Sequence, residues 1–396
     1  MVRSSAMRWF TCTPVAFGGG PDFFARDSGL LCRGFQALGC ESRAVMPGER
    51  KPEDDADLIR TDFANLESAA WWRGHQLDGV VLYAWGSPKF RKVARAIRQA
   101  GIFLVLNQDN GGLVSPLAGF RGWIEEQWIM TGRGDQIAFF KTVARGIAGL
   151  IATDPMRAAH LKEGNVIACV SPVAASHYRK LCRIYGGTAL TGRVKLLPHP
   201  VETRFHFEGA KTRQVACVGR WQDHLQKRPL LMQAVIRRLV ESDTEVRVEI
   251  VGNLTDPLQD WHHLLGPDLR ERVSMRGMVN REQLAEILRR SQVFYSPSAF
   301  ESFGIAAGEA LCSGCSVAAG RSVSMASFEW FVSENSGTLA AADNAEGHLG
   351  ALLRELESWR LGLRDPVLIA ARWRDRLHED RVAAKALEFA SDPKFI

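Results

Sequence analysis

Residues 291–320, SQVFYSPSAFESFGIAAGEALCSGCSVAAG, decide the fold of this chain. A short apolar run, Val293 to Tyr295, leads into a loop that carries Glu301, and a helix is expected from Ile305 to Leu311. A second apolar run, Ser316 to Ala319, follows the helix at once. The order strand, loop, helix and strand predicts one crossover unit of a parallel α/β sheet.

The loop and the helix of this stretch each hold a carboxylate, Glu301 and Glu309. A helix N-terminus presents unpaired backbone N–H groups and the positive end of a dipole, which suit an anionic ligand. Two carboxylates are poor phosphate ligands, so their natural partners are hydroxyl groups. A ligand that combines phosphate with hydroxyls is a sugar nucleotide. Taken singly, Glu309 also fits an exposed helix carboxylate, and Glu301 fits a capping charge.

Composition describes a soluble globular protein with two domains. The chain has 396 residues, of which 46% are hydrophobic and 24% charged, enough for two cores of ordinary size. No apolar run approaches the roughly 20 residues that span a bilayer. The start, Met1 to Ala6, lacks the apolar core and cleavage pattern of a signal peptide. We therefore expect a cytoplasmic protein, and Cys312 and Cys315 are expected to pack rather than to bind a metal.

A net charge of +6 gives little sign of a polyanionic partner. The basic residues gather in runs with the spacing of solvated helix faces, such as Lys89 to Arg98. Neither zinc-finger spacing nor basic-aromatic interleaving occurs, so no nucleic acid is expected as a partner. Peripheral attachment to the inner face of an anionic membrane stays open as an alternative.

Both halves of the chain alternate strands with helices, which predicts parallel sheets covered on both faces. Expected strands are Met7–Thr13, Ser42–Met46, Gly79–Tyr83, Phe103–Asn107, Gly149–Ala152, Val166–Val170, Val194–Leu197, Gln214–Val218, Val246–Val251 and Arg272–Arg276. Expected helices are Asp22–Leu38, Pro88–Ala100, Pro229–Glu241, Glu282–Arg290 and Asp380–Ala390.

We predict an α/β protein of two facing Rossmann-like domains whose strand ends meet at a central cleft. The N-terminal, acceptor-side domain is expected at 1–198, and a polar linker follows at 199–213. The C-terminal, donor-binding domain is expected at 214–379. The last segment, 380–396, is expected to form a helix that packs back on the N-terminal domain.

A loop in the second half carries two cations. Gly219 ends an expected strand and lets a ligand approach the backbone, and Arg220 follows it. Arg220 can bind two phosphate oxygens at once, and Lys227, before the next helix, adds a second charge. The pair suits a diphosphate, although a surface ion-pair cluster would look the same in isolation.

Two features of the first half are less specific. Gly18, Gly19 and Gly20 follow the first strand and allow close backbone approach, but they match neither dinucleotide nor P-loop patterns. Asp109, after the strand Phe103–Asn107, is the N-domain candidate for a polar group near an acceptor, and a turn-forming Asp fits equally. Asp55-Ala56-Asp57 has a metal-binding D-x-D spacing, but a solvated turn is the preferred interpretation and no metal is expected.

Together these residues resemble the family 4 retaining glycosyltransferases of the GT-B fold, over most of the chain. Glu301 and Glu309 resemble that family's E-x7-E motif, and Gly219-Arg220 with Lys227 its phosphate-binding Gly-Arg and Lys. Arg276-Gly277-Met278-Val279 resembles the turn that contacts the nucleotide base through its backbone.

Two short stretches depart from the family's pattern. His199-Pro200 stands where Asn-Gly is usual, in the passage to the linker. Gln108-Asp109-Asn110 stands where many relatives have a loop with a histidine. The first departure affects the linker more than the chemistry, and His199 is left out of the expected catalytic set.

The resemblance implies a role for each matching residue. Glu309 accepts hydrogen bonds from the ribose, and Glu301 contacts the donor sugar. Arg220 and Lys227, with backbone amides of the loop, stabilise the departing diphosphate. The remaining expected nucleotide-binding residues are Ser302, Phe303, Gly304, Ile305, Gly219, Gly277, Val279, Gly18, Gly19 and Gly20.

The resemblance further implies transfer of a sugar with retention, by front-face displacement, from a nucleotide-sugar co-substrate. No cofactor is expected. The acceptor, a glycan, lipid or small molecule, is not identified, and a place in cell-envelope polysaccharide biosynthesis is implied. A sugar-nucleotide epimerase or phosphorylase of the same fold, or a non-catalytic sugar-nucleotide-binding protein, remains the alternative.

Overall fold

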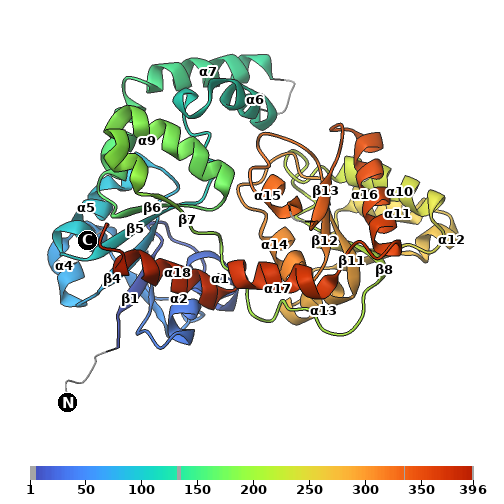
Figure 1. Ribbon diagram of the computed structural model, residues 1–396, viewed down its shortest axis with the longest axis horizontal. Helices are drawn as coiled ribbons and strands as arrows, with labels where there is room; N and C mark the ends of the chain where they lie inside the picture. Colours follow the sequence, from blue (N-terminus) through green and yellow to red (C-terminus); the bar gives the residue numbers. More distant parts are fainter. Residues whose placement is uncertain (1–5, 132–134, 334, 395–396) are drawn as a thin grey trace. The chain divides into compact units, whose positions relative to one another are not determined.

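The computed structural model describes residues 6–131, 135–333 and 335–394, and its contacts divide the chain into two compact units (Figure 1). Unit 1 comprises Met1–Glu202 and Arg376–Ile396, and unit 2 comprises Thr203–Asp375. Most of Met1 to Ala6, on which the signal-peptide argument rests, lies outside the described residues. Among the described helices, none is long and apolar enough to cross a membrane.

Within its described residues, unit 1 forms a seven-stranded parallel sheet in the order β3-β2-β1-β4-β5-β6-β7. The strands are β1 (Trp9–Cys12), β2 (Ala44–Pro47), β3 (Leu58–Thr61), β4 (Gly79–Tyr83), β5 (Phe103–Gln108), β6 (Val166–Cys169) and β7 (Val194–Leu196). The helices are α1 (Pro21–Phe24), α2 (Asp27–Ala37), α3 (Phe63–Leu66), α4 (Ala69–Gly74), η1 (Pro88–Phe90), α5 (Arg91–Gln99), η2 (Pro116–Ala118), α6 (Phe120–Met130), α7 (Gln136–Gly149), α8 (Thr153–Leu161), α9 (Pro172–Gly192) and α18 (Glu379–Ser391). Strand order reverses between β1 and β4, which is where open α/β sheets bind ligands.

Both faces of the unit 1 sheet are buried. Along β4, Leu82 joins one hydrophobic core and the next residue, Tyr83, joins the other. Phe10 and Trp9 of β1 divide between the same two cores. This alternation is what a parallel strand covered by helices on both sides requires.

The C-terminal helix α18 packs against α2 in unit 1 (Figure 1). Gly34 permits the close approach, because a Cβ at this position would lie 2.2 Å from the carbonyl oxygen of Glu379. Val201 joins the same region: its N–H donates to Leu377 (2.7 Å), and its carbonyl accepts from Glu379 (3.1 Å). The segment expected as a linker, 199–213, therefore begins within unit 1.

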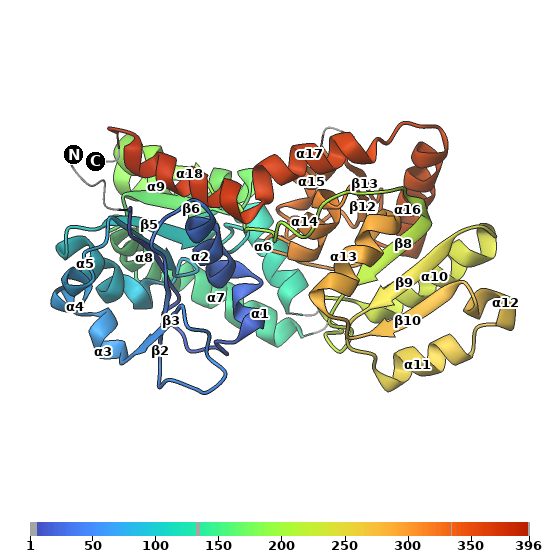
Figure 2. The same cartoon turned by 90° about the horizontal axis from the view of Figure 1, so that it is seen from below.

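Unit 2 forms, within its described residues, a six-stranded parallel sheet in the order β10-β9-β8-β11-β12-β13. The strands are β8 (Thr212–Val218), β9 (Arg247–Val251), β10 (Val273–Gly277), β11 (Ser291–Ser296), β12 (Ser316–Ala319) and β13 (Gly337–Leu339). The helices are α10 (Pro229–Ser242), α11 (Asp256–His263), α12 (Pro267–Arg270), α13 (Arg281–Arg290), α14 (Ile305–Cys312), α15 (Phe328–Val332), α16 (Ala345–Arg360) and α17 (Pro366–Leu377), whose last two residues belong to unit 1. Helices α10 and α16 lie side by side (Figure 2).

Some expected elements need correction. The predicted strand Gly149–Ala152 is wrong: Gly149 ends α7, and the rest of the run is a mostly exposed turn before α8, in which Ile151 is 88% exposed. The predicted helix Asp22–Leu38 is two helices, because Asp27 has a left-handed backbone with φ of 51°. The edge strands β3 and β13 were not predicted, since each is very short and only partly buried.

Candidate functional sites

In unit 2, the loops that follow β8 and β11 meet at the carboxyl ends of the sheet. These strands are neighbours, and the chain leaves them toward α10 and α14. The N–H of Ala299 donates to the carbonyl of Gln226 (2.8 Å), and the Gln226 side chain donates to the carbonyl of Phe300 (3.0 Å). This is the reversal point of the sheet, where a ligand is expected.

Lys227 and Glu301 form an ion pair across these two loops. Their side chains are only 16% and 12% exposed, and Ser298 donates a hydrogen bond to the same Glu301 oxygen at 3.0 Å. Lys227 stands just before α10, and the next residue, Arg228, has a left-handed backbone with φ of 49°. The predicted phosphate-binding cation and the predicted sugar-binding carboxylate therefore touch each other.

Arg220 lies in the same loop as Lys227 but faces water. Its side chain is 67% exposed, donates to Gln226 (3.0 Å) and lies 3.7 Å from Asp223. Exposed ion pairs of this kind contribute little stability, typically less than about 1 kcal/mol. The guanidinium can therefore exchange these partners for an anionic ligand at small cost.

Helix α14 begins at Gly304, whose backbone is left-handed with φ of 83°. A Cβ at this position would lie 2.7 Å from the Phe328 ring, so both conformation and space require glycine. Gly304, at the N-cap position, has no side chain that could cap this helix, and the N–H of Ala307 donates to the Gly304 carbonyl at 2.9 Å. Of the other predicted loop residues, Phe303 is buried and Ser302 and Ile305 are half-buried.

Glu309 is a buried carboxylate, not an exposed one. It is 2% exposed and pairs with Arg281 of α13 at 2.7 Å. The guanidinium of Arg281 lies over the ring of Phe205, 4.7 Å from its centroid, and stays 29% exposed. The sequence did not single out Arg281, because only the packing of α13 beside α14 brings it to Glu309.

Glycines line the other half of the strand ends in unit 2. The N–H of Gly219 donates to Val251 (3.1 Å), and that of Gly252 donates to Gly277 (2.9 Å). Gly252 has φ of 124°, and a Cβ there would lie 1.8 Å from the Gly219 oxygen. Val279, after Gly277, is half-buried. Gly219 and Gly277 thus lie on one bare edge of backbone.

Unit 1 contains a pocket of about 580 Å³ above the ends of β1, β4 and β5. Gly18, Gly20 and Asp109 line it. Gly19 does not, because it faces the Asp54 side chain instead. Of the predicted N-domain residues, the structure thus gathers three at one pocket and separates the fourth.

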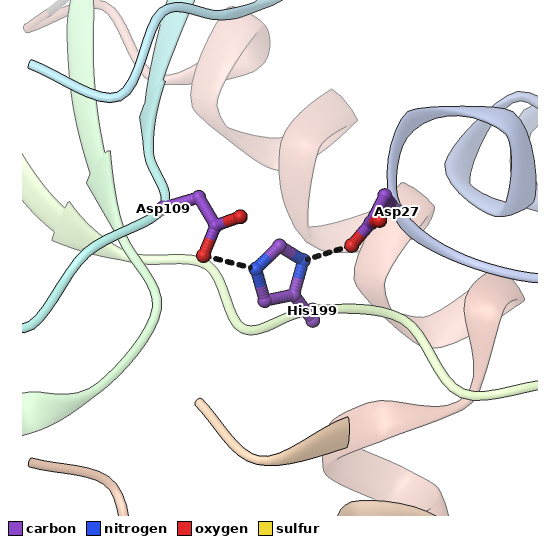
Figure 3. Close-up of side chains that lie close together, drawn as sticks. All are labelled: Asp27, Asp109 and His199. Atoms are coloured by element: carbon purple, nitrogen blue, oxygen red, sulfur yellow. Dashed lines mark ion pairs between the residues drawn. The ribbon is translucent and has the colours of Figure 1, made fainter. Parts of the chain in front are cut away.

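Asp109 belongs to a cluster with His199 and Asp27 (Figure 3). The His199 ring lies between the two carboxylates, with Nε2 2.7 Å from Asp109 and Nδ1 3.5 Å from Asp27. Asp109 follows β5, His199 follows β7, and Asp27 begins α2. The Tyr83 ring stacks on His199 with centroids 6.4 Å apart.

The charges of this cluster favour a protonated histidine. Burial lowers the pKa of His199, but the carboxylates of Asp109 and Asp27 outweigh that effect and raise the pKa to about 9. Burial raises the pKa of Asp27, and His199 opposes that shift. The imidazolium therefore bridges two carboxylates near neutral pH.

The same three side chains could offer ligand atoms to a metal, all within 4.8 Å of one another. A metal would need the neutral imidazole, whereas two carboxylates hold the proton on it. The D-x-D stretch is also engaged, since Asp55 and Asp57 pair with Arg33 at 2.8 and 2.5 Å.

The sequence alone missed Asp27 and His199 as functional candidates. His199 was visible as a departure from the usual Asn-Gly, but nothing in the sequence connected it to Asp109. The β5-β6-β7 order of the sheet makes that connection.

Residues 212–358 match the family model described as Glycosyl transferases group 1. This region runs from β8 into α16 and includes Arg220, Lys227, Glu301 and Glu309. Among curated proteins, no sequence matches the chain significantly.

Solved structures share the architecture of the whole chain. Anabaena HepE in complex with UDP and glucose is 13% identical with a TM-score of 0.58, covering 97% of this chain and 99% of that one. The lipopolysaccharide outer core galactosyltransferase WaaB is 13% identical with a TM-score of 0.63 and the same coverage. A putative UDP-N-acetylglucosamine 2-epimerase from Listeria monocytogenes is 13% identical with a TM-score of 0.56, covering 98% of both chains. The predicted two-domain α/β GT-B fold is thereby confirmed.

The His199 cluster makes stability depend on pH. Folding raises the pKa of His199 from 6.5 to about 9. The contribution of the protonated His199 to folding stability is therefore fully present below pH 6.5 and is lost as the pH rises through 9. The shift corresponds to about 3 kcal/mol. The free energy of unfolding is measured in urea at pH 6.5 and 9.5. Between these pH values the wild-type protein should lose about 3 kcal/mol more of it than His199→Gln does. The control His206→Gln, at a partly exposed histidine, should lose as much as the wild type. An equal wild type–His199→Gln difference at both pH values would contradict a protonated His199.

Proposed function

We propose that this protein is a family 4 retaining glycosyltransferase that moves a sugar from a nucleotide-sugar donor to a glycan, lipid or small-molecule acceptor. The observation that carries the proposal is the Lys227–Glu301 pair at the reversal point of the unit 2 sheet. It lies inside the region that matches the Glycosyl transferases group 1 model. An ion pair between loops is ready to open for a ligand that offers both phosphate and hydroxyl groups.

On this proposal the donor exchanges partners with the pair. The diphosphate binds Lys227 and Arg220, because a phosphate offers more charge than the single carboxylate that Lys227 meets now. Glu301, released from Lys227 but still bonded to Ser298, then accepts hydrogen bonds from the donor sugar. The uncapped N-terminus of α14 adds backbone N–H donors and a favourable dipole for the same phosphates.

The nucleoside would lie along the remaining strand ends. Glu309, held by Arg281, accepts hydrogen bonds from the ribose hydroxyls. Gly219, Gly277 and Val279 offer their backbone groups to the base. Arg281 is then a positioning residue for Glu309.

We propose retention by front-face displacement. The bond between the anomeric carbon of the donor sugar and the diphosphate oxygen breaks, and the bond from that carbon to the acceptor oxygen forms on the same face. The departing diphosphate takes the proton from the acceptor hydroxyl. Arg220 and Lys227 stabilise the charge that develops on the leaving group, so that neither metal nor cofactor is needed. Asp109 is the proposed acceptor-side polar group in unit 1.

An epimerase, a phosphorylase or a non-catalytic binding protein would use the same unit 2 features. The putative epimerase from Listeria monocytogenes shares the fold, but at 13% identity it carries no argument about chemistry. The separate unit 1 pocket, with its charged cluster, favours transfer, because an epimerase needs no second ligand. A place in cell-envelope polysaccharide synthesis, in the cytoplasm, is part of the proposal.

We also propose peripheral contact with an anionic membrane through α7. Exposed apolar side chains follow one side of this helix: Ile137, Phe140 and Ile147 are 69%, 66% and 49% exposed. Two cations, Lys141 and Arg145, flank this stripe and are exposed. Apolar residues beside Lys and Arg are the composition of a helix that lies in the membrane interface.

Donor binding is tested by a thermal-shift panel of UDP-, GDP- and ADP-sugars. At least one should stabilise the protein, and Arg220→Ala or Lys227→Ala should weaken its binding about 10-fold or more, since each loses a charge-assisted contact. Arg237→Ala removes an exposed unit 2 cation on α10 and should change nothing. The proposed donor site would be contradicted if no sugar nucleotide stabilised the protein, or if both Arg220→Ala and Lys227→Ala bound the stabilising sugar nucleotide as tightly as the wild type does.

Retention is tested by the product. With the stabilising donor and a panel of candidate acceptors, NMR should show a new glycosidic bond with the anomeric configuration of the donor, and Glu301→Ala should abolish turnover. A product of opposite configuration overturns retention. An epimer or a sugar phosphate without a glycosylated product supports the rival enzymes, and binding without turnover supports the non-catalytic protein.

Membrane contact is tested by sedimentation with phosphatidylglycerol and phosphatidylcholine vesicles. Wild type should bind the anionic vesicles, and more weakly at high salt. The double variant Ile137→Ser, Phe140→Ser should lose at least about 10-fold in affinity, while Leu264→Ser, an exposed apolar residue of unit 2, should not. No binding by wild type, or concentration-dependent dimers that the double variant abolishes, would rule out a membrane role for α7.

A further inference from the structure

The unit 1 pocket combines aromatic rings with carboxylates. Phe17 and Trp85 meet edge to face at 6.5 Å on one side. Asp22, Glu53 and Asp109 lie among its other lining residues. At Gly18 a Cβ would meet no atom within 4 Å, so the pocket is open to the backbone there.

Tyr83 gives the pocket an unsatisfied polar group. The residue is 2% exposed, and its hydroxyl has no hydrogen-bond partner among the described residues. It lines the pocket. A buried hydroxyl without a partner costs on the order of 1–3 kcal/mol, so a ligand hydroxyl that pairs with it gains that amount back.

The backbone around the pocket is held in a strained arrangement. Trp85 has a left-handed backbone with φ of 49°, and its carbonyl accepts a hydrogen bond from Asn110 at 3.1 Å. Asn110 follows Asp109, so one short loop fixes both an aromatic wall and a carboxylate. Strain of this kind persists where the surroundings over-determine a site.

Charge decides which ligand fits. His199 and its two carboxylate partners carry a net negative charge, and Asp22 and Glu53 add to it. Arg26 is the cation among the lining residues of the described chain. An anionic ligand would be repelled, whereas hydroxyl groups can donate to carboxylates that His199 already holds in place.

We infer that this pocket binds an uncharged, hydroxyl-rich sugar ring, which Asp109 and Tyr83 grip through its hydroxyls and Trp85 contacts through its apolar face. His199 is a positioning residue, because it fixes Asp109 and Asp27 and reaches no ligand itself. The inference rests on the proposed function, in which this ring is the acceptor. The inference adds that the pocket does not bind an acceptor whose ring carries a phosphate or carboxylate group.

The test uses sugars that differ in charge and not in ring. Methyl glycosides of glucose, galactose and mannose, with glucuronate and glucosamine, are titrated into the full chain by saturation-transfer NMR, with UDP present. At least one neutral glycoside should bind, and glucuronate at least about 10-fold more weakly. Tyr83→Phe and Asp109→Asn should each weaken binding by a similar factor, while Tyr185→Phe, a tyrosine whose hydroxyl bonds to Leu150, should not.

The role of His199 is read from a pH profile. Binding of the neutral glycoside should fall between pH 8 and 10 in wild type and stay flat in His199→Gln. Among the residues that the structure describes, Asp27, Asp109 and Tyr83 are charged or titratable groups that face His199. Burial raises the pKa of Tyr83 well above its usual range, so a change between pH 8 and 10 that His199→Gln abolishes belongs to His199.

Each outcome separates this inference from the donor proposal. If UDP still stabilises the protein but no neutral glycoside binds, the inference about the unit 1 pocket is wrong and the proposed donor site is unaffected. Tighter binding of glucosamine overturns it in favour of a cation site, and tighter binding of glucuronate overturns the charge argument. Identical pH profiles in wild type and His199→Gln overturn the positioning role.

Discussion

The ion pair between Lys227 and Glu301 is the interaction on which the unit 2 site depends. It joins the loops after β8 and β11, and both side chains are mostly shielded from water. Breaking such a pair by removing one partner typically costs about 3–5 kcal/mol, because the other charge is left buried. A ligand that supplies an anion to Lys227 and hydroxyls to Glu301 avoids that cost by giving each group a new partner. The proposed donor chemistry follows from this exchange.

Glycine conformations shape the surfaces around the pair. Gly304 has a left-handed backbone and starts α14 against the ring of Phe328. Gly252 lets the ends of β8 and β9 approach so closely that a single added carbon would strike the Gly219 carbonyl. At both positions a side chain would collide with a neighbouring group, so the close packing around these strand ends requires glycine.

In unit 1 a buried cation also stabilises carboxylates, but here one cation lies between two of them. His199 is buried between Asp27 and Asp109, and its charge allows two carboxylates to stand close together at the edge of a pocket. Burial alone would favour the neutral ring, so the carboxylates decide its state. The Tyr83 hydroxyl beside them remains without a partner among the described residues, and a buried polar group of this kind calls for an explanation.

Local sequence determined many of the strands and helices, although not the strand expected at Gly149–Ala152. The strand predicted at Ser316–Ala319 is β12 to the residue, and that at Gly79–Tyr83 is β4, because buried parallel strands are continuous apolar runs. It also placed Glu301 in a loop and Glu309 on a helix, and it singled out Lys227 and Asp109. Only the tertiary structure decided that Lys227 meets Glu301, that Glu309 is buried against Arg281, and that Asp109 shares His199 with Asp27. These contacts join positions far apart in the chain, and they depend on strand order and helix packing, which no local periodicity encodes.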